Sequence, residues 1–268
     1  MDDLEISLSR FMLIYLLLVL VLLVMKKLRM GQTKLLITAS IKMTVQLVIA
    51  GLLLEYIFKA EHPAFTVLYL GVMLGFTVHR VLSRSPWMNF KFKAIAAASI
   101  LISGILVLTY FIVAVAEQNL LNPQYVIPIG GMVVGNIMNA MTLALKAFRD
   151  GLDGRQSQIN ALLCAGAPAK NILLPFARQA LETAILPSLN SMLGMGIVHL
   201  PGMMTGQILA GAVPFTAILY QIAIMISICA ANVLACFLTL YFGCQTMYDR
   251  QTQIISIMAE GQEGPHRS

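Results

Sequence analysis

Long apolar segments separated by short polar stretches repeat along the chain. Each segment approaches the roughly 20 residues that an α-helix needs to cross a bilayer. The segments run from about Ile6 to Met25, Leu35 to Phe58, Ala64 to Val81, Ala94 to Ala116, Tyr125 to Lys146, Ala180 to Val198 and Val213 to Phe242. This pattern predicts an all-α fold, a polytopic integral membrane protein with about seven transmembrane helices.

The composition supports the same fold class. With 59% hydrophobic and 11% charged residues, the 268-residue chain has too little polar surface to cover a soluble globule of its size. We therefore expect one transmembrane domain over residues 1–248, followed by a polar cytoplasmic tail over residues 249–268.

The placement of charge predicts the orientation in the membrane. The first apolar segment has acidic residues before it and basic residues after it, the reverse of a cleavable signal peptide. Fifteen of the 18 Lys and Arg residues lie in segments that the positive-inside rule then places in the cytoplasm. The predicted topology is N-out and C-in. Attraction to anionic inner-leaflet lipids explains the net charge of +6, so the expected partner is the lipid bilayer and not nucleic acid.

Catalytic and metal-binding motifs are missing from the sequence. There is no GxxxxGK[ST], HExxH or GxSxG pattern, and the four histidines are scattered. The four cysteines form no CxxC and no outer pair, so neither a disulfide nor a zinc site is expected. The sequence predicts a protein that is not an enzyme, and any ATP hydrolysis must come from a partner.

The longest predicted inner segment, about residues 149–178, mixes charges, glycines and prolines with an amphipathic stretch. Gln158 to Cys164 is expected to form a short helix before the break at Gly166-Ala167-Pro168. Such a helix between two spans can dock a partner. The alternative is an interfacial loop whose leucines rest among lipid headgroups.

Polar side chains within the apolar segments suggest a translocation pathway. Asn136 and Asn139 share one helix face, beside the close-packing pair Gly131 and Gly135. Helix packing through amide hydrogen bonds is the alternative role for the asparagines. The other candidates for the pathway gather near one outer end: Asn190, Ser191, His199, Thr205 and Gln207.

An outer Gly-rich loop is expected over about residues 200–211, with the sequence LPGMMTGQILAG. Irregular backbone at membrane depth is tolerated only where protein or a water-filled cavity satisfies it, so this loop indicates a pathway. Its candidate gate or hinge residues are Pro201, Gly202, Gly206 and Gly211.

Methionines and two charges complete the candidates. Met192 and Met195 form the nearest MxxM pair among 17 methionines, for which packing is favoured over soft-metal ligation, so the metal ligands are left unknown. Lys42 lies within the second apolar segment and Glu55 near its outer end. Charge at that depth is costly and is either structural or functional.

The chain resembles the FetB family of ABC-transporter permeases, which includes bacterial metal-export permeases and plant aluminium-tolerance relatives. The resemblance covers roughly Met132 to Met225 and rests on GMVVGNIMNAMTLAL, INALLCAGAPAKNILLPFARQ and LPGMMTGQILAG. It implies a homodimeric permease in the bacterial inner membrane, bound to a separately encoded ATPase subunit that carries ATP and Mg. This chain would bind no cofactor itself. The implied role is export of iron or a related metal, which relieves oxidative stress.

By the same resemblance, residues 159–167 are the coupling helix that enters the ATPase. The implied coupling residues are Arg155, Ala161, Leu162, Gly166 and Ala167. Asn160 stands where relatives carry an acidic residue, which argues against a charge contact there. Two other readings remain: a stand-alone ion-coupled transporter or channel that uses Lys42, Glu55 and His199, and a non-transporting membrane scaffold.

Overall fold

The computed structural model describes residues 13–29, 31–60 and 62–247, and the predicted tail at 249–268 lies outside this range. All regular elements in the described part are helices, which confirms the all-α class. The chain divides into two compact units, Met1–Ala60 and Glu61–Ser268.

The first unit contains two apolar helices, α2 (Ile14–Lys27) and α3 (Thr33–Ala60). Helix α2 ends in Lys26 and Lys27, where cations interact favourably with the helix dipole. The two helices are joined by a hydrogen bond of 2.9 Å between the hydroxyls of Tyr15 and Thr44.

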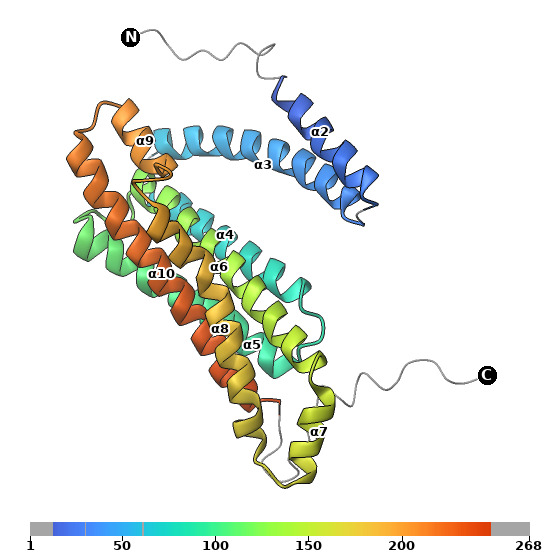
Figure 1. The fold of residues 1–268 in the computed structure, drawn as a ribbon. Coiled ribbons are helices and arrows are strands. Elements are labelled where there is room, and N and C mark those ends of the chain that lie inside the picture. The colour runs from blue at the N-terminus through green and yellow to red at the C-terminus, as the bar shows by residue number, and fades with distance from the viewer. Residues whose placement is uncertain (1–12, 30, 61, 248–268) are drawn as a thin grey trace. The chain divides into compact units, whose positions relative to one another are not determined.

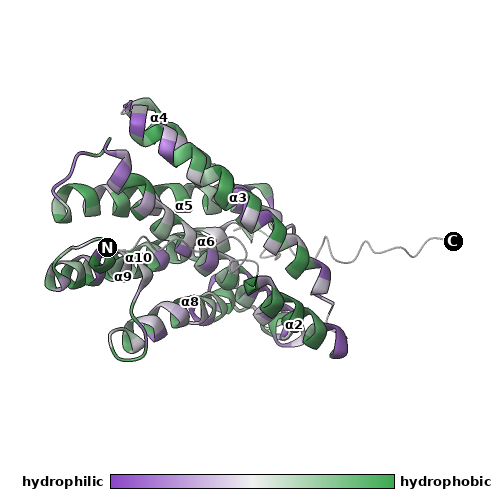
Figure 2. Cartoon of the chain, turned by 90° about the horizontal axis from the view of Figure 1, so that it is seen from above, coloured by the Kyte–Doolittle hydropathy of each residue, from purple (hydrophilic) through white to green (hydrophobic). Residues whose placement is uncertain are grey.

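The second unit is a helical bundle (Figure 1). Its elements in chain order are α4 (Pro63–Ser83), α5 (Phe90–Tyr110), the π-helix η1 (Phe111–Val115), α6 (Pro123–Asp153), α7 (Gln156–Cys164), α8 (Ala169–Gly194), α9 (Gly202–Leu209) and α10 (Pro214–Gln245). Proline occupies the first position of α4, α6 and α10, where its missing N–H removes no helical hydrogen bond. Figure 2 shows apolar residues along most of each long helix.

The core of the bundle lies where α5, α6, α8 and α10 meet. Fully buried Phe92, Phe111 and Phe148 fill it, together with aliphatic side chains from α6. At one end of the core, Gly243 of α10 approaches the Phe92 ring so closely that a Cβ there would come within 2.7 Å of it. The glycine therefore sets the distance between α5 and α10.

The same end of the bundle is fastened by Asn89, which caps α5. Its Oδ1 accepts a hydrogen bond of 2.7 Å from the Phe92 N–H, and its Nδ2 donates one of 3.0 Å to the carbonyl of Thr246. One side chain thus satisfies the start of α5 and the end of α10.

Five helices of the described residues are long and apolar enough to cross a membrane. They are Thr33–Lys59, Pro63–Ser83, Phe90–Val115, Pro123–Asp153 and Pro214–Gln245. The first expected span lies partly outside the described residues. The sixth corresponds to α8, which begins at Ala169 rather than near Ala180 and contains Pro175 and Pro187. Seven spans and the N-out, C-in orientation therefore stay predictions.

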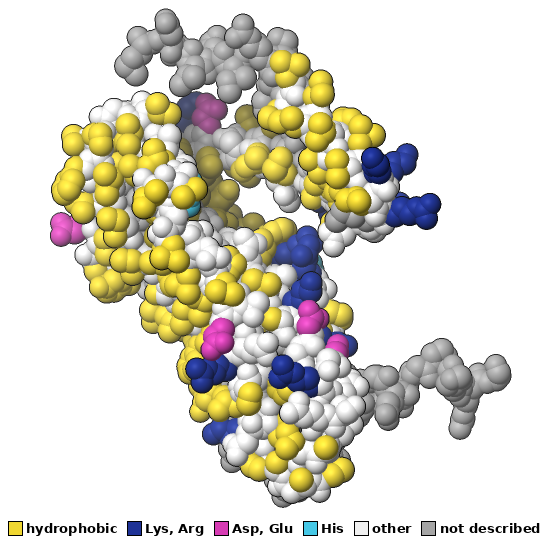
Figure 3. Space-filling model, viewed as in Figure 1, with side chains coloured by type: hydrophobic (Ala, Val, Ile, Leu, Met, Phe, Trp, Pro, Cys, Tyr) yellow, Lys and Arg dark blue, Asp and Glu magenta, His cyan; other side chains and the backbone are white. Residues whose placement is uncertain are grey.

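Basic residues lie in one half of the bundle. Residues 62–247 contain nine Lys and Arg residues, which lie toward the end of α4, the start of α5, the end of α6, the start of α7 and the first half of α8. They are Arg80, Arg84, Lys91, Lys93, Lys146, Arg149, Arg155, Lys170 and Arg178. The contacts of Trp87 with Phe148 and Arg149 bring the α4–α5 connection to the end of α6, next to α7. On the face drawn in Figure 3, basic side chains gather at this end of the bundle.

Candidate functional site

A cavity of about 170 Å³ lies between α6, α8 and α10. Polar side chains from all three helices line it, amid apolar residues that include Leu143, Met225 and Ile228. The polar lining residues are Asn136, Asn139, Ser188, Ser191 and Asn232. This cavity is the candidate translocation site, and we call it the polar cavity.

The most buried polar groups of the cavity are Asn232 and Ser188. The Nδ2 of Asn232 donates a hydrogen bond of 2.9 Å to Ser188 Oγ. Asn232 Oδ1 is buried and has no hydrogen-bond partner among the described residues. A buried acceptor without a partner costs free energy, so this oxygen is set up to accept a hydrogen bond from water or a solute.

Helical spacing explains why the other polar groups meet here. Asn136 and Asn139 on α6, like Ser188 and Ser191 on α8, are three residues apart and share a face. The Nδ2 of Asn136 donates a hydrogen bond of 2.8 Å to the carbonyl of Met132. The side-chain oxygen of Asn136 remains available as an acceptor in the cavity.

The chemistry of the polar cavity is neutral. Its polar groups are amides and hydroxyls, which can replace part of a hydration shell but carry no charge. Among the described residues, no group of three or more His, Cys, Asp or Glu could hold a metal ion. Such a lining suits passage of a polar or hydrated solute better than tight retention of a hard metal ion.

The sequence analysis identified part of this lining. Asn136, Asn139 and Ser191 were expected and do line the cavity, whereas Ser188 and Asn232 were missed. Both missed residues carried a signal, because a buried amide in an apolar helix is costly and Ser188 lies one turn before Ser191.

The remaining predicted pathway residues do not line the polar cavity. Asn190, His199 and Thr205 are exposed. The Thr205 hydroxyl donates a hydrogen bond of 3.1 Å to the carbonyl of Pro201. Gln207 is half-buried, and its Oε1 has no hydrogen-bond partner among the described residues. The His199 ring lies beside Gly194.

The expectation of irregular backbone over residues 200–211 is wrong for most of that stretch. Residues 202–209 form α9, in which Gly202 and Gly206 have helical neighbours and open space around them. The left-handed glycines flank this helix, at Gly196 (φ +83°) and Gly211 (φ +95°). Freedom to bend is therefore concentrated before and after α9, and Pro201 caps its start. A gate role for these residues stays a prediction.

The inner segment contains the expected short helix, which begins two residues earlier than predicted. Ile159 anchors α7 to the bundle at 1% exposure. Asn160, Ala161 and Leu162 are exposed on the same helix. At its start, the Arg155 guanidinium lies 5.8 Å from the centre of the Phe176 ring.

A Schellman motif ends α7. Gly166 has φ +78°, its N–H donates to the Leu163 carbonyl, and the Ala167 N–H donates to the Leu162 carbonyl, both at 3.0 Å. This motif uses the glycine for a backbone conformation that other residues rarely adopt. Gly166 and Ala167 therefore fix where the chain turns from α7 into α8.

The two charges of the second apolar segment are placed differently. Glu55 forms an ion pair of 2.6 Å with Lys59, one turn later, and both side chains are exposed. Lys42 is exposed on α3 and forms no ion pair with another described residue. Neither charge belongs to the polar cavity.

The model of an uncharacterised protein family, UPF0014, matches residues 8–248. The UPF0014 membrane protein YjkA of Bacillus subtilis is 36% identical over 79% of this chain and 83% of its own length. "Protein ALUMINUM SENSITIVE 3" of Arabidopsis thaliana is 28% identical over 78% of this chain and 76% of its own length. "Probable iron export permease protein FetB" of Escherichia coli is 29% identical over 79% of this chain and 80% of its own length. No solved structure matches the chain significantly.

Proposed function

Because the chain belongs to the UPF0014 family of multi-pass membrane proteins, we propose that it is the membrane-spanning permease subunit of an ABC transporter. In this proposal it exports iron or a related metal ion, and a separate subunit hydrolyses the ATP. The Escherichia coli relative bears the name "Probable iron export permease protein FetB", which supports this cargo class. Membership confirms the family that the sequence pattern indicated.

The observation that carries the proposal is α7. A nine-residue helix, held by the buried Ile159 and closed by the Schellman turn at Gly166, presents Ala161 and Leu162 to its surroundings. Because both ends of α7 are fixed to long helices, a push on α7 is transmitted to α6 and α8. Those two helices line the polar cavity.

The distribution of charge supports a cytoplasmic position for α7, which is the side on which an ATPase would bind. All nine cations of residues 62–247 lie in the α7 half of the bundle, and the positive-inside rule assigns that half to the cytoplasm. ATP-driven approach of two ATPase subunits would then act on α7 of each protomer in a homodimer. The polar cavity is the proposed route between the two sides.

Co-purification tests the proposal. The tagged chain is extracted from native membranes in mild detergent, and its partners are identified by mass spectrometry. We expect a stoichiometric soluble protein with a Walker A sequence, which is lost with Leu162→Glu because the charge opposes burial of this exposed leucine. The matched control is Asn171→Glu, which adds the same charge to the exposed start of α8.

Two results would overturn the proposal. One is the absence of any ATPase, even after cross-linking in the membrane. The other is metal flux through vesicles that contain only this chain, which would make it a stand-alone transporter.

A further inference from the structure

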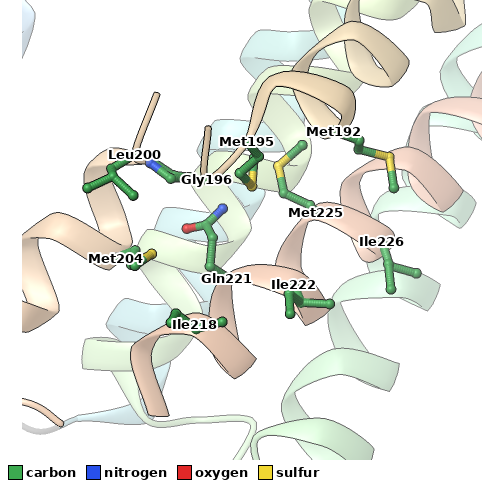
Figure 4. Close-up of a pocket in the computed structure, with 11 residues that line it drawn as sticks. Met192, Met195, Gly196, Leu200, Met204, Ile218, Gln221, Ile222, Met225 and Ile226 are labelled. Carbon is green, nitrogen blue, oxygen red and sulfur yellow. The ribbon is translucent and has the colours of Figure 1, made fainter. Parts of the chain in front are cut away.

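A second, larger pocket lies between the end of α8, the segment that leads into α9, and the first half of α10. Its volume is about 510 Å³, and four of the chain's 17 methionines line it. They are Met192, Met195, Met204 and Met225 (Figure 4). We call it the methionine pocket. Its methionines come from three different parts of the chain, so they meet only in the folded protein.

One polar side chain enters this apolar pocket. Gln221 is 6% exposed, and its Oε1 is buried without a hydrogen-bond partner among the described residues. In Figure 4 its amide nitrogen lies toward Met195, and its oxygen lies on the side of Met204. Of residues 13–29, 31–60 and 62–247, no Lys, Arg, Asp, Glu or His lines the pocket. It therefore offers thioether sulfurs and one amide oxygen, all of them uncharged.

Packing alone does not account for this arrangement. Methionine is a common filler of apolar cores, but here the side chains surround open space instead of closing it. An unpartnered amide oxygen in that space adds a cost that a packing role would avoid.

Donor chemistry selects the ligand. Thioether sulfur is a soft ligand that favours Cu⁺, whereas Fe²⁺ and Mn²⁺ require harder nitrogen or oxygen donors. An uncharged donor set also favours a single charge over a double one, because the cost of desolvating the ion rises steeply with its charge.

We propose that the methionine pocket binds a soft monovalent cation, Cu⁺ or its analogue Ag⁺. The sulfurs of Met195 and Met225 are the principal ligands. The Gln221 oxygen completes the site once the carboxamide flips by 180°, which exchanges the positions of its oxygen and nitrogen. Met192 and Met204 line other parts of the same pocket and can act as alternative ligands when the ion moves. Unbranched methionine side chains change rotamer readily, which allows this exchange of ligands.

The position of the site gives it a role in transport. Met225 lines both the methionine pocket and the polar cavity, so an ion held on its sulfur adjoins the proposed route. Gly196, with φ +83°, is also part of the pocket lining and allows the chain to bend beside Met195. That the ion is the exported cargo rests on the proposed function, whereas the binding site itself does not.

Equilibrium binding of Ag⁺ to the purified full-length chain tests the site. Accessible thiols, including the exposed Cys164, are first alkylated. We expect one Ag⁺ per protomer in wild type, and affinity at least tenfold weaker in Met195→Leu/Met225→Leu. Leucine preserves volume and apolar character, so this variant should fold, which its melting temperature in detergent checks. The matched control, Met43→Leu on the exposed face of α3, should bind like wild type.

Unchanged Ag⁺ binding in the double variant would place the ion on other groups and overturn the site. The same conclusion follows if wild type binds no Ag⁺, or if a co-purified lipid or detergent molecule occupies the pocket instead. A tenfold loss in the double variant supports the site even if no ATPase co-purifies, so failure of the transport proposal is separable from failure of this one.

Discussion

Asn232 on α10 and Ser188 on α8 are joined by a buried hydrogen bond of 2.9 Å across the polar cavity. The bond uses one of the two donors of the Asn232 amide, and the amide oxygen has no hydrogen-bond partner within the described part of the chain. The pair therefore holds two helices together and at the same time keeps one acceptor available to a solute.

Asn232→Leu should abolish most transport without unfolding the bundle. The substitution keeps the branched shape of the side chain but removes the unpartnered acceptor and the hydrogen bond to Ser188, so stability should fall by about 1–3 kcal/mol. ATP-dependent accumulation of Fe²⁺ and of Ag⁺ in inverted vesicles should fall at least tenfold. Asn190→Leu is the control, because Asn190 is exposed and does not line the cavity. Equal losses in both variants would remove the special role of Asn232.

Gly166→Ala should weaken coupling to the ATPase. A residue with a Cβ at φ +78° is strained by about 1–2 kcal/mol, so the end of α7 should fray. We expect a reduced yield of the co-purified ATPase. Gly206→Ala is the contrast, because Gly206 lies within α9 with open space around it and alanine favours the helix by about 1 kcal/mol. A normal ATPase yield with Gly166→Ala would argue against α7 as the docking element.

Gly243→Ala should destabilise the bundle by about 1–3 kcal/mol, because its Cβ would overlap the buried Phe92 ring. Thermal unfolding in detergent measures the effect. Phe92→Leu combined with Gly243→Ala should cost less than the sum of the single changes, since each relieves the other. Gly135→Ala, with nothing within 4 Å of its added Cβ, should be close to neutral. Additive costs in the double variant would show that the two residues do not clash.

Labelling of Cys164 tests the orientation. This thiol is exposed at the end of α7, which the charge distribution assigns to the cytoplasm. A membrane-impermeant maleimide should label it in inverted vesicles and not in intact cells. Cys164→Ser should lose that labelling, which identifies the site. Labelling in intact cells would reverse the predicted topology.

The apolar pattern was enough to predict the long helices, but not their ends and not the short helix α9. Five expected spans correspond to long apolar helices, since about 20 apolar residues in sequence have few other structures open to them. The start of helix α8 was misplaced because its first half, which contains Lys170 and Arg178, is amphipathic and not uniformly apolar. Ile172 and Leu173 are buried, so packing against the bundle stabilises this part of α8. The hydropathy of the sequence does not indicate such packing.

The candidate site was predicted less completely, for a physical reason. Asn136 and Asn139 are neighbours on one helix, so local spacing was sufficient to pair them. Asn232 meets Ser188 across 44 residues, and only the packing of α8 against α10 brings them together. The methionine pocket likewise collects side chains from separate segments, so the MxxM spacing of Met192 and Met195 underestimated the cluster.

The Asn89 cap also constrains the order in which this protein can be assembled. Its side chain can donate a hydrogen bond to the Thr246 carbonyl only after the next 157 residues have been synthesised. At about 5–20 residues per second, synthesis of that stretch takes roughly 8–30 s. Until α10 is made, the side of the Phe92 ring that packs against Gly243 lacks this contact. Packing of α10 is thus a late step in folding of the bundle. Substitutions that weaken this packing should therefore lower the amount of protein in the cell, through degradation, before they slow transport.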